Sequence, residues 1–403
     1  MLRHCDAFRT SVLSLPAFRY VIPCHAEQPL LNQKARALVS QSRPPRKPAD
    51  CKSWKLRTTR HPMKILLVNA SAPSYNLAIA KARNYWTAKG ATVCEATEVP
   101  SLFMRNEGFD LVWISVIFSW HVPNAIRIAQ EALRFSIPTE IGGCGTFGLQ
   151  QEIYEATGIR PQARPDHRFE RQPGSYKMVF WSRGCPAKNC SLGFPHDGRP
   201  AICSVPEMEG WRFTLYDDVT PARIILDNNL SALPKQHQEL IIDRTLAESF
   251  TTVDANSGFE PRSFKPETCE RWLRLPLVAW RFAYDELSEL PAVTRMMEIL
   301  DDYGVSRKAR HIYCLAGNEP IEACEERVKT IVRWKSVAIV QRRRPLNWQG
   351  EDILSLPTLH DWTPQKLIDF QRWGNRLSGA FPFSAYRRGM KDGDALTEPL
   401  AFL

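Results

Sequence analysis

Residues 111–141 read LVWISVIFSWHVPNAIRIAQEALRFSIPTEI, and this stretch decides the fold. Its first eight residues, 111–118, are an apolar run that predicts a buried strand. Residues 122–135 show helical spacing, and residues 138–141 predict a second short strand. The helical spacing places three side chains on one face: Ile126, Ala129 and Leu133. A strand, a helix and a second strand in this order are typical of a parallel sheet covered by helices.

The same alternation begins upstream of this stretch. Residues 64–69 (KILLVN) predict a strand, and residues 77–89 predict a helix that Gly90 ends. Ligands of such sheets bind at the carboxyl ends of the strands, which here are the loops 70–76, 119–123 and 142–147. Glycines in the last loop favour a tight turn and would also let the backbone approach a ligand. We therefore expect a Rossmann-like domain over residues 63–150.

Six further strand candidates follow, with helical segments between them. They are Met178–Ser182, Arg223–Leu226, Thr251–Asp254, Val278–Tyr284, His311–Ala316 and Val337–Gln341. Polar residues come directly after the first five, at the end of the strands where a TIM-type barrel places its chemistry. The sequence therefore predicts an α/β protein with a Rossmann-like parallel-sheet domain followed by a partial (β/α)6 TIM-type barrel over residues 175–345.

The remaining segments are less regular. Residues 1–62 hold 12 Lys and Arg residues against three acidic residues, and thus account for most of the formal net charge of +10. They are expected to be a basic, disordered extension. A transit peptide, a phosphate-binding arm and sequence upstream of a natural start at Met63 remain open as explanations. Residues 151–174 are rich in Arg and Pro and are expected to be a linker. Residues 346–403 are expected to be a C-terminal helical extension, with one helix over 364–375.

Composition excludes several classes of protein. The sequence contains no run of 18 or more apolar residues, which is the length that a membrane-spanning helix needs. Beyond residue 62 the chain is close to neutral, so nucleic acid is not an expected partner. The 11 cysteines are odd in number and follow no secretory signal, which indicates a reducing compartment, and we expect the cytoplasm. The sequence contains no Walker lysine loop, zinc-protease helix or Gly-x-Ser-x-Gly elbow.

The loop after the first barrel strand carries three of the cysteines. Residues 183–210 read RGCPAKNCSLGFPHDGRPAICSVPEMEG, with thiols at Cys185, Cys190 and Cys203. Three thiols on a loop rich in Gly and Pro can wrap a soft metal centre. On a [4Fe–4S] cluster they would leave one iron without a protein ligand. With His196 they would instead complete a tetrahedral zinc site. A loop without metal is the third alternative.

Four pieces of this sequence together resemble the radical S-adenosylmethionine (SAM) superfamily, in particular members with a cobalamin-binding-like N-terminal domain. The pieces are Arg183-Gly184-Cys185, the tail Cys203–Gly210, the segment Leu226–Asn229, and Asp254–Arg262 after the third barrel strand. The resemblance covers roughly residues 63–347.

The resemblance implies a function. Cys185, Cys190 and Cys203 would bind a [4Fe–4S] cluster, and SAM would chelate the open iron. One electron would cleave SAM to a 5′-deoxyadenosyl radical, which abstracts hydrogen from a substrate. A reductant protein is then an expected partner. Residues at strand ends would face the methionyl end of SAM (Asp227, Asn228 and Asn229) or line the cofactor or substrate side (Asp254, Asn256 and Arg262). The substrate and any catalytic side chain are left unassigned.

The sequence departs from the family pattern in two places. The usual Cys-x3-Cys-x2-Cys is Cys-x4-Cys-x12-Cys here, so a degenerate, cluster-free or zinc-binding relative acting as a binding or structural protein is the alternative. The cobalamin motif Asp-x-His-x-x-Gly does not occur in residues 63–150, where His121 is a lone histidine near a strand end. Cobalamin is therefore expected to bind without a protein ligand to cobalt, or not at all.

Overall fold

The computed structural model describes residues 62–98, 108–174, 177–187, 190, 202–349, 360–376, 378 and 381–388. The predicted extension at positions 1–61 and His196 of the zinc alternative lie outside the described residues. Contacts divide the chain into a unit of residues 1–54 and a unit of residues 55–403, and every described residue belongs to the second. Within the described ranges, the helices are all too short or too polar to cross a bilayer.

The first sheet has four parallel strands in the order β2-β1-β3-β4. The strands are β1 (Lys64–Asn69), β2 (Thr92–Ala96), β3 (Leu111–Ser115) and β4 (Thr139–Gly142). Its helices are α2 (Leu77–Ala88), α4 (Val122–Arg134) and α5 (Gln150–Thr157), with short 3-10 turns η2 (Ser119–His121) and η3 (Cys144–Thr146). Helix α2 begins where predicted because the Asn76 side chain accepts hydrogen bonds from the amides of Ala78 and Ile79. The edge strand β2 is an addition that the sequence pattern did not predict.

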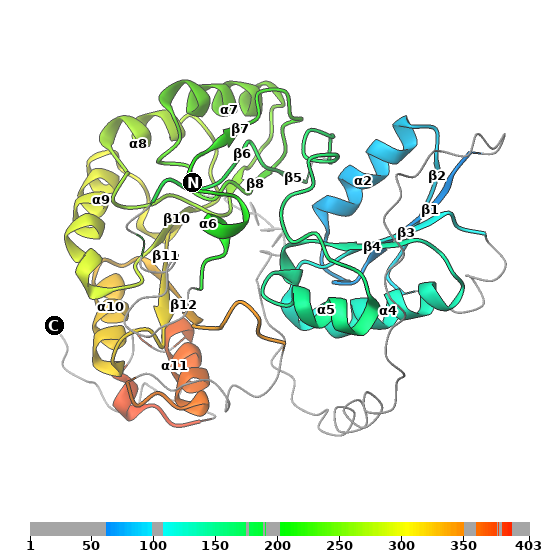
Figure 1. Cartoon of the computed structure of the whole chain (residues 1–403). Coiled ribbons are helices and arrows are strands. Elements are labelled where there is room, and N and C mark those ends of the chain that lie inside the picture. Colours follow the sequence, from blue (N-terminus) through cyan, green and yellow to red (C-terminus); the bar gives the residue numbers. More distant parts are fainter. Residues whose placement is uncertain are drawn as a thin grey trace, which may run out of the picture. The chain divides into compact units, whose positions relative to one another are not determined.

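Helices cover both faces of this sheet (Figure 1). Because side chains alternate along a strand, Ile65 and Leu67 of β1 pack toward α2, whereas Leu66 and Val68 pack toward α4 and α5. The result is a three-layer α/β/α arrangement, which confirms the predicted Rossmann-like domain.

The segment expected to be a linker, residues 151–174, is partly regular. Its first residues belong to α5, and Ile153 is buried in the same apolar cluster as β1, β3 and α4. Further along, Gln162 forms a parallel bridge with Gly142 at the end of β4. Residues up to about 162 thus pack on the first sheet, because α5 has an apolar face that the composition of the whole segment conceals.

Six parallel strands follow in chain order. They are β5 (Met178–Val179), β8 (Ile224–Ile225), β9 (Asp254–Ala255), β10 (Trp280–Ala283), β11 (Arg310–Ala316) and β12 (Val337–Arg342). Two three-stranded sheets, β5-β8-β9 and β10-β11-β12, are joined by parallel bridges between Val253 and Leu277 and between Phe259 and Phe282. The predicted partial (β/α)6 barrel is therefore confirmed. The first predicted strand, 178–182, is divided: Ser182–Arg183 form β6, which pairs antiparallel with β7 (Thr214–Leu215).

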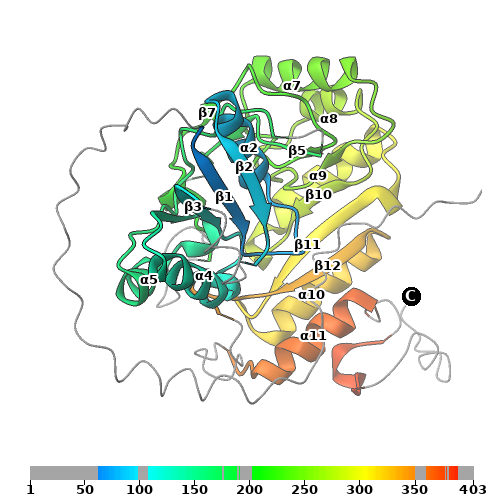
Figure 2. The same cartoon turned by 90° about the vertical axis from the view of Figure 1, so that its right-hand side faces the viewer.

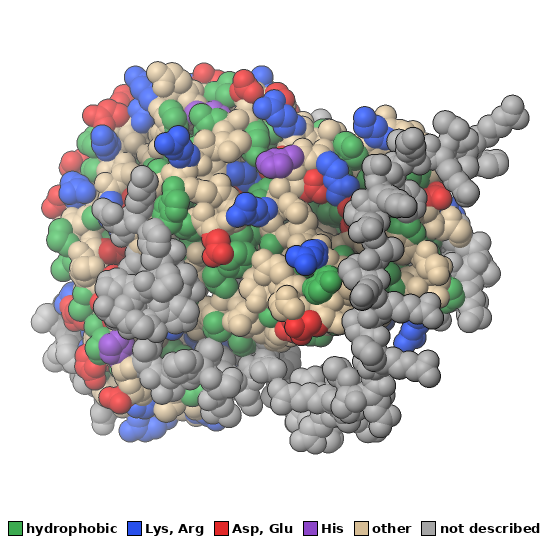
Figure 3. Space-filling view, in the orientation of Figure 1, with side chains coloured by type: hydrophobic (Ala, Val, Ile, Leu, Met, Phe, Trp, Pro, Cys, Tyr) green, Lys and Arg blue, Asp and Glu red, His purple; other side chains and the backbone are tan. Residues whose placement is uncertain are grey.

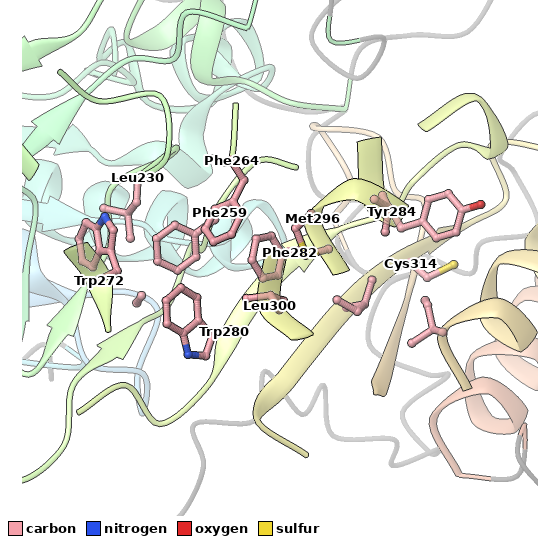
Figure 4. Packing of buried hydrophobic residues seen from close by; sticks show 14 of the residues in the cluster. Leu230, Phe259, Phe264, Trp272, Trp280, Phe282, Tyr284, Met296, Leu300 and Cys314 are labelled. Atoms are coloured by element: carbon pink, nitrogen blue, oxygen red, sulfur yellow. The ribbon is translucent and has the colours of Figure 1, made fainter. Parts of the chain in front are cut away.

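Helices lie between these strands, and the four longer ones cover their outer side (Figure 1). They are α6 (Val205–Met208), α7 (Lys235–Ala247), α8 (Pro266–Trp272), α9 (Leu290–Asp302) and α10 (Ile321–Arg333), with 3-10 turns η5 (Leu287–Glu289) and η6 (Arg307–Ala309). The core beneath the helices is largely aromatic (Figure 4): Trp280 and Phe282 of β10 meet Phe259, and the rings of Phe259 and Trp280 stack at 5.3 Å. Such buried rings each contribute several kcal/mol to stability, typically about 3–5 kcal/mol on truncation to Ala.

The predicted C-terminal helix is α11 (Pro364–Arg376), followed by a 3-10 turn η8 (Phe383–Ala385). Its buried face consists of Leu367, Phe370 and Trp373, as predicted. It packs against β12 and lies beside α10 on the same side of the sheet (Figure 2). On the surface, acidic and basic side chains are interspersed on the face drawn in Figure 3.

Candidate functional site

The three cysteines of the predicted cluster loop follow β6, at the carboxyl end of the barrel strands. Cys185 lies two residues after β6, Cys203 lies two residues before α6, and Cys190 lies between them along the chain. All three are free thiols and half-buried. Burial, with smaller contributions from Cys190 and Cys185, raises the pKa of the Cys203 thiol to about 11.

The described residues contain no group of three or more His, Cys, Asp and Glu side chains already arranged as a metal site. The donor set is nevertheless of the kind that an iron–sulfur cluster takes, because the loop carries three free thiols and iron–sulfur clusters take thiolate ligands. Binding would require the thiols to lose their protons, as any thiolate metal site does.

Glu209 closes the base of this loop. Its carboxylate accepts hydrogen bonds from the Gly184 amide at 3.0 Å, from Asn228 Nδ2 at 2.8 Å and from Arg183 Nη1 at 3.2 Å. Beside it, the Cys185 amide donates to the Gly210 carbonyl at 3.2 Å. The residues next to the first cysteine are thus fixed to the residues that follow the third.

Gly184 is required at this base. Its φ is +90°, and a Cβ atom there would lie well inside 3.0 Å of the Arg212 carbonyl oxygen. Only glycine combines this backbone conformation with so close an approach to the neighbouring chain. The local backbone geometry therefore explains the glycine in the Arg183-Gly184-Cys185 segment.

A buried charged network extends from the loop to the first sheet. Glu170 accepts from Arg183 Nε at 2.9 Å, and Lys81 on α2 donates to the Glu170 carbonyl oxygen at 2.7 Å. Lys81 and Glu170 are almost fully buried. Burial lowers the pKa of Lys81 to about 8, against the opposing effect of Glu170. Sequence reasoning missed this network, because Lys81 and Glu170 lie 89 positions apart and share no motif.

Asp227, predicted to face SAM, lies inside the protein. It has no exposed surface, and its carboxylate accepts from the Trp181 amide at 3.0 Å and the Ser182 hydroxyl at 2.5 Å. Burial raises the pKa of Asp227 to about 6, although both hydrogen bonds lower it. The observed contacts therefore give Asp227 a structural role, in which it ties β6 to the end of β8.

The two asparagines that follow are at the cysteine loop. Asn228 donates to Glu209, as described above. Asn229 is 3% exposed, its Oδ1 accepts from the Ala232 amide at 3.1 Å, and its Nδ2 points to Cys185 Sγ at 3.8 Å. Asn229, which was predicted to face SAM, thus directly contacts Cys185, a predicted cluster ligand.

Three predicted residues lie in β9 and after it, and their contacts differ. Asp254 forms a two-pronged ion pair with Arg281, at 2.9 and 2.7 Å, and shows no contact with the cysteines in the described structure. Asn256 is half-buried, and its amide donates to the Ile225 carbonyl. Arg262 is exposed and paired with Glu260. Burial lowers the pKa of Arg262, but mainly its hydrogen bond to Glu260 and the charges of Glu260 and Glu289 raise it above its ordinary value overall.

A second buried cluster lies at the carboxyl ends of β10 and β11. Arg327 of α10 is fully buried and donates to Glu319 Oε2 at 2.9 Å, to Cys314 Sγ at 2.8 Å and to the Tyr284 carbonyl at 2.8 Å. Beside it, burial raises the pKa of Asp285 to about 7, helped by Glu289. Because Arg327 of α10 contacts residues from both strands, it holds the carboxyl ends of β10 and β11 together.

The carboxyl edge of the first sheet is tightly packed. Gly143 has a φ of +105°, and a Cβ there would lie well inside 3.0 Å of the Val116 carbonyl oxygen. The predicted tight turn thus accounts for the glycine. His121 lies among Phe118 and Trp120, its Nδ1 is buried without a hydrogen-bond partner, and burial lowers its pKa. The Nδ1 atom of His121 thus faces protein.

Three comparisons bear on this geometry. No family model and no curated protein matches the sequence. Among solved structures, the radical SAM methyltransferase TsrM from Kitasatospora setae, with cobalamin and a [4Fe–4S] cluster bound, is similar with a TM-score of 0.54. The two chains are 12% identical, and the likeness covers 73% of this chain and 78% of that one. This likeness shows the fold.

The cobalamin-dependent SAM radical enzyme OxsB is more distant. Its apo and aqua-cobalamin-bound structures give TM-scores of 0.40 and 0.42 at 13% and 12% identity, covering 66% of this chain and 51% of OxsB. At these scores the match carries no argument. The shared Rossmann-like and TIM-type architecture therefore rests on TsrM and on the strand order of the chain itself.

Proposed function

We propose that this protein is a radical SAM-type enzyme that binds a [4Fe–4S] cluster through Cys185, Cys190 and Cys203. The observation that carries the proposal is the position of the three thiols, on one loop at the carboxyl end of a partial (β/α)6 barrel, where Asn229 after β8 meets Cys185. The fold likeness to TsrM supports it. When bound, the cluster would supply one electron for the reductive cleavage of SAM.

The side chains of this chain would do the positioning. Glu209 and the Cys185–Gly210 hydrogen bond would hold the ends of the ligand loop. Asn229 would donate to the Cys185 sulfur, because its Nδ2 already points there. Arg262, which follows β9 at the carboxyl end of the barrel strands, would carry positive charge toward an anionic group such as the SAM carboxylate. A reductant protein would deliver the electron, and the substrate is not assigned.

Cobalamin is not part of the proposal. The described part of residues 63–150 offers no Asp-x-His-x-x-Gly histidine, and the Nδ1 atom of His121 is buried against protein. Zinc on the same loop is the competing interpretation and is an outcome of the experiment below.

The test is anaerobic reconstitution of the full chain with iron and sulfide, followed by measurement of bound iron, visible absorption and 5′-deoxyadenosine formed from SAM. We expect about four irons per chain on the basis of one [4Fe–4S] cluster, and loss of the product in Cys185→Ala, Cys190→Ala and Cys203→Ala. Cys94→Ala is the matched control, because Cys94 is also a half-buried free cysteine but lies on β2. Tight binding of zinc with no iron would refute the enzyme in favour of a zinc-binding relative.

A further inference from the structure

We propose that Glu209 is the positioning residue that lets three widely spaced cysteines act as one ligand set, an inference that rests on the function proposed above. Twelve residues separate Cys190 from Cys203. A free loop of this length would leave the third thiol far less ordered than the first two. The structure instead fixes both ends of the loop at a single carboxylate.

The contacts of Glu209 explain how. Oε2 accepts from the Gly184 amide and from Asn228 Nδ2, at 3.0 and 2.8 Å, and Oε1 accepts from Arg183 Nη1 at 3.2 Å. These donors belong to the ends of β6 and β8. Glu209 itself follows the single-turn helix α6, which begins two residues after Cys203. One carboxylate therefore links the residue before Cys185 to the helix after Cys203.

Burial makes this link strong. The Glu209 side chain is 8% exposed and that of Arg183 is 16% exposed. Hydrogen bonds to a charged, buried acceptor are stronger than neutral ones, and a donor left without its acceptor is costly. The neighbouring bond from the Cys185 amide to the Gly210 carbonyl lies beside this carboxylate and depends on the same geometry. Glu209 would thus keep Cys185 and Cys203 at the base of the loop.

The variant Glu209→Gln tests this role. It preserves the size of the side chain, removes its charge, and presents an NH2 group to donors that need an acceptor. Substitution of a residue that supports a metal ligand typically lowers metal affinity by about 10–100-fold. We therefore expect reconstituted E209Q to lose iron to a chelator about tenfold faster than wild type. Removal of a negative charge near a cluster also raises its reduction potential, so the potential of E209Q should move in the positive direction.

Glu207→Gln is the matched control. Glu207 lies in α6, two residues before Glu209, and is exposed. E207Q should match wild type in iron retention and in reduction potential. Glu209→Asp keeps the charge, and its potential should stay near that of wild type even if iron retention falls. Asn228→Ala removes one donor to the same carboxylate, and should weaken iron retention in the same direction if E209Q does not fold.

A measurement on protein without iron separates the two proposals. Hydrogen exchange should be faster at the Gly184 amide in E209Q than in E207Q, because only E209Q replaces an oxygen of the carboxylate that accepts from this amide with an NH2 group and removes its charge. If wild-type protein takes up no cluster, the proposed function fails and this inference fails with it. If wild type takes up a cluster, while E209Q retains iron at the wild-type rate with an unchanged potential, the inference alone is overturned.

Discussion

Asp227 is a carboxylate whose ionisation opposes folding. It is fully buried, and its pKa is raised from 3.8 to about 6, mainly by burial. Because the folded state holds the proton more tightly than the unfolded chain, the contribution of this group to stability is lost as the pH rises from about 4 through about 6. The difference between the two pKa values corresponds to about 3 kcal/mol. A residue predicted from the sequence to bind SAM thus carries a cost of burial that its two hydrogen bonds only partly offset.

The substitution Asp227→Asn tests this account at the residue scale. Asparagine resembles the protonated carboxyl group: its Oδ1 can accept from the Trp181 amide and its Nδ2 can donate to the Ser182 hydroxyl. We expect D227N to match wild type near pH 4 and to be more stable by up to about 3 kcal/mol near pH 7. The free energy of unfolding, measured in urea across this range, reports the difference. Asp302→Asn, at an exposed position of α9, should show no such trend, and a constant D227N difference at all pH values would contradict the account.

At the scale of elements, α11 depends on a close approach to β12. Gly374 lies on the buried face of α11, and a Cβ there would lie well inside 3.0 Å of Val340 Cγ2. On the same contact, the Asn375 side chain accepts from the Val340 amide at 2.6 Å. Glycine normally weakens a helix by about 1 kcal/mol relative to alanine. Its presence here indicates that contact with the strand outweighs helix propensity.

A double-mutant cycle on Gly374 and Val340 measures this contact. Gly374→Ala should destabilise the protein by about 1–3 kcal/mol through overpacking, despite the better helix propensity of alanine. Val340→Ala alone should also be destabilising, because Val340 is buried. The double variant should be more stable than the sum of the two effects predicts, since the smaller side chain makes room for the new methyl group. Additive effects in urea unfolding would show that the two side chains do not meet.

Elements with strong periodicity could be predicted, and their details could not. The six barrel strands and the buried face of α11 follow directly from apolar spacing. The predicted face of the helix at 122–135 was wrong for Leu133, which is 39% exposed. The buried face is rotated toward Val122, Ala125, Ile128, Ala129 and Ala132, and spacing alone did not distinguish it from the neighbouring apolar positions. The edge strand β2 was missed because its residues are mostly half-buried or exposed.

The candidate site shows the same division. The positions of the three cysteines could be predicted, because loop and barrel register follow from the sequence. Asp227 was predicted at the correct strand end, but the sequence does not tell which way its side chain points. In the structure the side chain turns inward, to Trp181 and Ser182. The Glu209 and Glu170 contacts were missed because each joins residues far apart in the chain. Long-range ion pairs leave no periodic signal in one sequence.

At the scale of the whole described structure, Glu170 joins α2 of the first sheet to β6 of the barrel. Two buried cations, Lys81 and Arg183, share this carboxyl group, at 3.9 Å and 2.9 Å from Oε2. Burial alone would raise the pKa of Glu170, but the positive charges of Arg183 and Lys81 lower it by more. The pKa of Glu170 therefore lies below its ordinary value. The stability that Glu170 contributes is therefore present at neutral pH and is lost as the pH falls through its lowered pKa.

The substitution Glu170→Gln tests this connection. It leaves both cations buried without their counter-charge, and we expect a loss of about 3–5 kcal/mol in the free energy of unfolding at pH 7. Adding Lys81→Met to E170Q removes one of the stranded cations and should restore part of that loss, although Lys81→Met alone leaves Glu170 paired with Arg183. Glu248→Gln, at an exposed carboxylate after α7, should leave stability within about 0.5 kcal/mol of wild type. If E170Q and E248Q unfold alike in urea, the network does not hold the first sheet to the barrel. A deficit in E170Q that Lys81→Met fails to relieve would instead place the whole effect on Arg183, and thus on the base of the cysteine loop.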